Sequence, residues 1–124
     1  MATAAVDFDV PDLAARIERL ERGDLDRLPF GVIRIDGEGT VLFYSATEAR
    51  QSGYGAVPLG ENLFAISPCM GDTDFRGRLT RAMAAGPVDL EFGWPGDYGD
   101  PHRALRIRVQ SARAGGVWLF IQRD

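Results

Sequence analysis

The only cysteine of the chain, Cys69, is the residue best suited to form a covalent bond. It follows Pro68, whose ring fixes the backbone and directs the next N–H and side chain. Taken alone, a single cysteine is most often a small buried hydrophobic residue. A thiol enzyme or redox sensor is disfavoured, because neither a His–Asp partner pattern nor a second cysteine accompanies Cys69. We therefore interpret Cys69 as an attachment point and do not expect an enzyme.

Two polar residues upstream have a spacing that brings side chains together. Tyr44 and Glu48 are four residues apart, at the predicted end of a strand and in the first turn of a helix. Taken singly, such a tyrosine usually packs with its hydroxyl satisfied, and such a glutamate is usually solvated and favoured by the helix dipole. Because both side chains could point into one pocket, we consider them together with Cys69 as a candidate site.

The composition is that of one globular domain. The chain has 124 residues, of which 45% are hydrophobic and 26% charged, and it holds no apolar run long enough for a membrane span. Its N-terminus lacks the features of a secretory signal, so a cytoplasmic location is expected. The net charge of −4 gives no attraction to nucleic acid or to anionic membranes, and one histidine with one cysteine disfavours a metal site.

Periodicity and turn residues predict two strands, short helices, one longer helix and three more strands. A first helix is expected over 11–22, and residues 1–29 are expected to form an N-terminal cap on a core of 30–124. The predicted core strands are 30–36, 40–45, 88–94, 105–112 and 117–122. Helical turns are expected over 46–50, where Ser45 can cap, and over 62–66, and a longer helix follows 72–74.

The last two strands predict how the sheet is covered. In the strand 105–112, Arg106 and Arg108 alternate with apolar residues and are expected to form a solvated face. In the strand 117–122 both faces are apolar, so both must be covered. We predict that the N-terminal segment covers one of them around Trp118, through Phe8, Leu13, Ile17 and Leu20.

The order of elements and the ordered set of Tyr44, Glu48 and Pro68-Cys69 resemble the photoactive yellow protein family of PAS domains. The likeness covers nearly the whole chain. It runs through Phe30-Gly31, Asp36-Gly37-Glu38-Gly39, Tyr44-Ser45-Ala46-Thr47-Glu48, Gly60-Glu61-Asn62-Leu63-Phe64, Ser67-Pro68-Cys69 and Trp118-Leu119-Phe120-Ile121. The resemblance implies an α+β PAS fold, with a five-stranded antiparallel sheet, helices on one face and an N-terminal helical cap on the other.

The resemblance also implies a blue-light photoreceptor. Its chromophore would be 4-hydroxycinnamic acid (p-coumaric acid), joined to Cys69 as a thioester. Tyr44 and a protonated Glu48 would donate hydrogen bonds to the phenolate, and Ser52 would support Tyr44. A buried phenolate needs such donors, and burial raises the pKa of a carboxyl. After light absorption Glu48 would give up its proton, and the unpaired buried charge would release the N-terminal cap.

The remaining expected pocket residues follow from the same likeness. They are Tyr54, Leu63, Ile66, Pro68, Phe92 and Trp94. Tyr54 stands where the family usually has an arginine lid, and Gly99 stands where a methionine assists recovery. His102, beside Pro101, is expected to be exposed and inert.

Two alternatives to a photoreceptor remain open at this point. The chain would also suit a PAS module that binds another small ligand or a partner protein without a chromophore, whereas the thiol chemistry considered above is the least favoured. For the photoreceptor we expect an unknown downstream signalling protein as partner, and a monomer or weak dimer. Protein produced without a source of cinnamate is expected to lack the chromophore.

Overall fold

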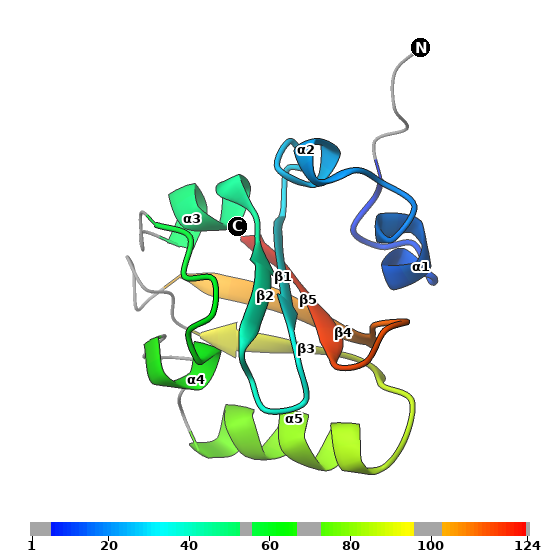
Figure 1. The fold of residues 1–124 in the computed structure, drawn as a ribbon, viewed down its shortest axis with the longest axis vertical. Helices are drawn as coiled ribbons and strands as arrows, with labels where there is room; N and C mark the ends of the chain where they lie inside the picture. Colours follow the sequence, from blue (N-terminus) through cyan, green and yellow to red (C-terminus); the bar gives the residue numbers. More distant parts are fainter. Residues whose placement is uncertain (1–5, 53–55, 67–72, 96–102, 124) are drawn as a thin grey trace.

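The computed structural model of the chain describes residues 6–52, 56–66, 73–95 and 103–123 (Figure 1). The helices are α1 Leu13–Ile17, α2 Arg22–Leu25, α3 Ala46–Ser52, α4 Leu63–Ile66 and α5 Thr73–Ala84. The strands are β1 Gly31–Ile35, β2 Val41–Tyr44, β3 Asp89–Pro95, β4 Ala104–Ser111 and β5 Val117–Arg123. The predicted order of elements is confirmed, except that the single helix expected over 11–22 is two short helices.

The break between α1 and α2 has a local backbone cause. Glu21, which precedes α2, is extended, with φ −81° and ψ 160°, so the helix cannot run on from α1. The turn between them leaves the side chain of Glu18 directed at the sheet, where its carboxylate accepts a hydrogen bond of 2.9 Å from the Trp118 indole Nε1.

All five strands belong to one antiparallel sheet in the order β2-β1-β5-β4-β3. β1 pairs with β5 from Gly31 opposite Ile121 to Ile35 opposite Val117. The first and last strands of the chain are therefore neighbours, and residues near the C-terminus lie beside the start of β1. The antiparallel sheet with helices confirms the α+β expectation.

Each face of the sheet carries its own buried cluster. Val117, Leu119 and Ile121 of β5 lie in one cluster with residues of α4 and α5. Trp118 and Phe120 lie in the other cluster, which includes the predicted cap residues Phe8, Leu13 and Ile17, with Leu20 partly buried against it. The prediction that the N-terminal segment covers the sheet around Trp118 is confirmed, and Figure 1 shows α1 and α2 on the side opposite α5.

The prediction of a solvated face on β4 is wrong at Arg108, whose side chain is buried. Its Nη1 donates to the carbonyl oxygens of Phe8 and Val10 at 2.6 Å each. Gln110, two residues on, donates from Nε2 to Pro11 O at 2.8 Å and accepts from the Ala14 N–H at 2.7 Å. Alternation indicated a polar face, but the backbone of the N-terminal segment supplies the hydrogen-bond partners there instead of water.

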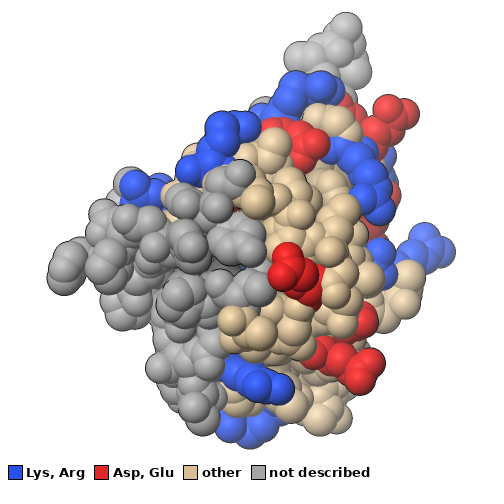
Figure 2. Space-filling view, turned by 60° about the vertical axis from the view of Figure 1, so that its left-hand side comes forward, with Lys and Arg blue, Asp and Glu red and all other residues tan. Residues whose placement is uncertain are grey.

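The surface gives no sign of a single dominant charge on the face shown in Figure 2. Acidic and basic side chains are both scattered among uncharged ones over the described part of this face. No helix in the described ranges is long and apolar enough to span a bilayer. Within the same ranges, no three His, Cys, Asp or Glu side chains are grouped so that they could hold a metal ion.

Candidate functional site

The first turn of α3 is tied to β1, and this orients Glu48. Ser45 Oγ accepts hydrogen bonds from the backbone N–H of Glu48 at 3.1 Å and of Val32 at 3.0 Å. Ser45 is therefore the expected helix cap, and the same oxygen joins the helix to the sheet. With this turn held against the sheet, the Glu48 side chain is directed inward and is only 2% exposed.

Tyr44 and Ser52 form a second buried polar contact, at the other end of α3. Tyr44 closes β2 and Ser52 closes α3, and both side chains are buried. The Tyr44 Oη and the Ser52 Oγ are 3.4 Å apart, which is a hydrogen bond in which either hydroxyl is the donor. Glu48 and Ser52, four residues apart, share one face of α3. The Tyr44 hydroxyl thus meets the Ser52 hydroxyl that was expected to support it, and Glu48 lies on the same face of α3 as Ser52.

The structure adds a residue that the sequence reasoning missed. Arg123, at the end of β5, donates from Nη1 and Nη2 to the two carboxylate oxygens of Glu48 at 2.8 Å and 2.7 Å. The Arg123 side chain is 4% exposed, so this is a buried two-point ion pair. The sequence held a signal for this position. Arg123 continues, at a spacing of two, the series Val117, Leu119 and Ile121, whose side chains face the core.

Gly31 makes the room for the ion pair. A Cβ atom at Gly31 would lie 1.8 Å from the Glu48 Oε1, so no larger residue fits there with the carboxylate in place. The Glu48 carboxylate therefore lies directly against the backbone of β1, one residue from Phe30.

This arrangement differs from the donor role expected of Glu48. A neighbouring guanidinium favours the ionised form of a carboxyl, and here Glu48 accepts two hydrogen bonds from Arg123. The charges of the pair balance. An additional buried anion, such as a phenolate, would leave one uncompensated negative charge unless Glu48 took up a proton. Tyr44 and Arg123 would then donate to anionic oxygen, and Glu48 could do so in its protonated form.

The other expected pocket residues are only partly accounted for. Leu63 is buried in the same core cluster as Tyr44, and Phe92 packs against that cluster. Ile66 is the last residue of α4 and Trp94 lies in β3, so the structure describes the backbone position of both residues. The remaining expected site residues lie outside the described residues, and these are Cys69, Pro68 and Tyr54. Gly99 and His102 lie outside them too.

A second arginine reaches the C-terminal end of α3. Arg103, just before β4, donates from Nη1 to the Gln51 carbonyl oxygen at 2.9 Å. A cation is favourable at this end of a helix, where carbonyl groups lack partners within the helix. The sequence reasoning did not single out Arg103, because its partner is 52 residues away along the chain.

Curated relatives resemble the chain over most of its length. A photoactive yellow protein of Cereibacter sphaeroides is 31% identical over 99 residues, which are 77% of this chain and 80% of that protein. The photoactive yellow protein of Rhodothalassium salexigens is 28% identical over 121 residues, 95% of this chain and 97% of that protein. No family model matches the chain.

Solved structures resemble it in fold. The photoactive yellow protein domain of the sensor histidine kinase Ppr from Rhodospirillum centenum aligns with a TM-score of 0.72 at 30% identity. The alignment covers 86% of this chain and 95% of that domain. The PAS domain of an HTR-like protein from Haloarcula marismortui aligns with a TM-score of 0.57 at 12% identity, over 89% of this chain and 98% of that one. Together they confirm the expected PAS fold.

Proposed function

Because the chain belongs to the photoactive yellow protein family, we propose that it is a blue-light photoreceptor that carries p-coumaric acid as a thioester on Cys69. When bound, this group supplies the absorption of blue light and a double bond that light isomerises. The proposal is of a sensor and not of an enzyme. Its output is a change in the surface offered to a downstream signalling protein.

The observation that carries the proposal is the buried polar cluster of Tyr44, Glu48, Ser52 and Arg123. Buried charged side chains are rare unless they are paired, and these four residues come from β2, α3 and β5. Their donors are suited to hold an anionic oxygen inside the protein, as a buried phenolate requires. Leu63 and Phe92 supply apolar surface near Tyr44, which suits an aromatic ring.

Charge balance gives each residue a role. We assign Arg123 as the counter-ion of the site, so that Glu48 can hold a proton on its carboxyl while an anion is present. Tyr44 donates from its hydroxyl, and Ser52 orients that hydroxyl. Loss of the proton from Glu48 leaves a carboxylate beside Arg123, which is the pairing that the structure shows. Glu48 is then the proton donor, and after losing its proton it forms the ion pair with Arg123.

Reconstitution tests the proposal. The full chain is incubated with the activated thioester precursor of p-coumaric acid, and intact mass and visible absorption are recorded. We expect a mass increase of one chromophore and a yellow colour that bleaches in blue light and recovers in the dark. The Cys69→Ala variant is expected to stay colourless with an unchanged mass.

A colourless wild-type protein of unchanged mass would contradict the proposal and favour a PAS module that binds another ligand or a partner. Infrared difference spectra of the yellow protein test the role of Glu48 separately. Illumination is expected to remove the band of a protonated carboxyl. If the Glu48→Gln variant still loses that band, the proton donor is another residue.

A further inference from the structure

A cavity of about 370 Å³ lies between the N-terminal segment and the outer face of the sheet, on the face that carries Trp118. Its apolar walls are Ile17 and Leu20 from the region of α1, Leu25 from α2, Leu42 and Phe43 from β2, and Trp118 from β5. Leu42 is 39% exposed, so the cavity opens to solvent at a leucine. Its size is within the range of small-molecule sites, about 300–1,000 Å³.

The charged residues of this cavity are predominantly basic. Arg22, Arg34 and Arg113 line it, and Glu18 is its one acidic lining residue. Glu18 is already engaged, because its Oε2 accepts from the Trp118 Nε1 and from the Arg113 backbone N–H at 2.9 Å each. Within the described ranges, none of the three arginines forms an ion pair. The cavity therefore has an excess of positive charge without a partner.

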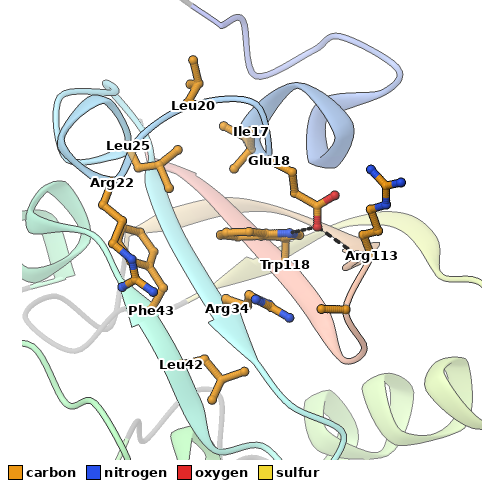
Figure 3. Close-up of a pocket in the computed structure, with 11 residues that line it drawn as sticks. Ile17, Glu18, Leu20, Arg22, Leu25, Arg34, Leu42, Phe43, Arg113 and Trp118 are labelled. Carbon is orange, nitrogen blue, oxygen red and sulfur yellow. Dashed lines mark hydrogen bonds between the residues drawn. The ribbon is translucent and has the colours of Figure 1, made fainter.

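Arg34 of β1 and Arg22 of α2 are arranged to receive an anion. The Arg34 guanidinium lies over the Trp118 ring, 5.7 Å from its centroid, and the Arg22 guanidinium lies 5.4 Å from the centroid of Phe43. These cation–π contacts use no N–H group of either guanidinium as a hydrogen-bond donor to an oxygen. Figure 3 shows Arg22 beside Phe43 at one end, Glu18 and Arg113 at the other, and Arg34 between them.

Arg34 in particular has unused donors. Its Nη2 makes one hydrogen bond of 3.3 Å to the Gly115 carbonyl oxygen, and its Nε is buried without an acceptor. A cation partly removed from water and left without a carboxylate is costly, and a bound anion would relieve that cost. Apolar walls beside it would hold the body of the same ligand.

We propose that this cavity binds a small amphipathic anion, with an apolar ring and one carboxylate, the carboxylate on Arg34 and the ring against Trp118. The site takes residues from both the N-terminal segment and the sheet, so the ligand contacts both. By linkage, it stabilises the docked form of that segment. The proposal does not depend on the chromophore.

A titration of the full chain, without chromophore, with phenylpropionate tests the site. Binding of phenylpropionate is followed by the chemical shift of the Trp118 indole N–H in NMR spectra. Phenylpropanol serves as the neutral control. We expect saturable shifts with phenylpropionate and at least tenfold weaker binding of the alcohol, because hydrogen bonds to charged groups account for discrimination of this size. Hydrogen exchange of the α1 and α2 amides is expected to slow as the acid binds.

Variants separate this site from weak general binding. Arg34→Gln is expected to weaken phenylpropionate binding at least tenfold, whereas Arg81→Gln, at an exposed arginine of α5 that does not line the cavity, is expected to leave it unchanged. Leu42→Glu tests the site at an exposed position, should Arg34→Gln fail to fold, and its negative charge is expected to abolish binding. Equal binding of acid and alcohol, unchanged binding in Leu42→Glu, or no saturation would overturn the proposal.

Discussion

At the scale of single residues, the ion pair of Glu48 and Arg123 is the most consequential feature of the site. Two charges removed from water are tolerated because each satisfies the other through two hydrogen bonds. A pair of this kind adds little net stability, since desolvation offsets the attraction. Removing one partner is different, because the other charge stays buried without this counter-ion.

We therefore expect Arg123→Gln to lower the free energy of unfolding by about 3–5 kcal/mol. The double variant Glu48→Gln with Arg123→Gln is expected to lose less than the two single variants added together, because it removes both charges of the ion pair at once. Urea unfolding of the chain without chromophore measures all three changes. The matched control is Arg106→Gln, whose side chain is 44% exposed in its ion pairs with Asp9 and Glu91 and is expected to cost about 1 kcal/mol or less. Additive losses in the double variant would contradict the coupling.

At the scale of elements, the hairpin between β1 and β2 depends on one ionised side chain. Asp36 Oδ1 accepts from the backbone N–H groups of Glu38 and Thr40 at 2.9 Å each. The bonds from Thr40, and then from Glu38, lower the pKa of Asp36 below its usual value of 3.8. They hold the turn that sets the register of the two strands.

The sign of the pH effect follows from this lowered pKa. Asp36 contributes stability above its unfolded pKa, near 4, and the contribution is lost as the pH falls through the lower folded value. We expect Asp36→Asn to be less stable than the parent protein at neutral pH, and the difference to shrink below about pH 4. Thermal unfolding at a series of pH values measures this, and a difference that stayed constant to pH 2 would contradict it.

Hydrogen bonds from β4 attach the N-terminal segment to the sheet. Arg108 donates to the carbonyl oxygens of Phe8, Val10 and Pro11, so one guanidinium holds three carbonyl groups within four residues of the chain. We expect Arg108→Gln to speed hydrogen exchange in α1 and to lower the free energy of unfolding by about 2 kcal/mol or more. Arg106→Gln, on the same strand, removes an exposed ion pair with Asp9 and is expected to speed exchange in α1 less than Arg108→Gln does. Equal effects of the two substitutions would contradict a specific role for Arg108.

The sequence predicted the elements better than their polar contacts. Alternation in β5 correctly assigned Trp118 and Phe120 to one face. The face on which an apolar residue of a strand lies follows from the pattern of its neighbours in the sequence. The burial of Arg108 and the pairing of Arg123 with Glu48 depend on segments 75 or more residues away. Hydrogen-bond partners at such separations are set by the topology, which periodicity does not reveal. The candidate site was therefore found in part, without its counter-ion.

At the scale of the whole molecule, the candidate site and the N-terminal segment meet at β1. The Glu48 carboxylate lies against Gly31, and the preceding residue, Phe30, belongs to the cluster beneath α1 and α2. The Phe30 ring contacts Phe8 edge-on, with 5.5 Å between centroids, and also Phe120 at 6.2 Å. A change in charge at Glu48 is therefore one residue from the packing that holds the segment in place.

This short route predicts which part of the molecule responds to light in the reconstituted protein. We expect illumination to speed hydrogen exchange in residues 6–28 and to leave α5, on the other face of the sheet, unchanged, because Phe30 packs in the cluster of that segment and not in the cluster of α5. Phe30→Leu is expected to reduce the difference between light and dark, since it keeps apolar bulk but removes the ring contacts. The same substitution at Phe64, in the other cluster, is the control and is expected to preserve the difference. If the protein bleached normally while residues 6–28 exchanged at the dark rate, the chromophore chemistry would stand and this route through Phe30 would be wrong.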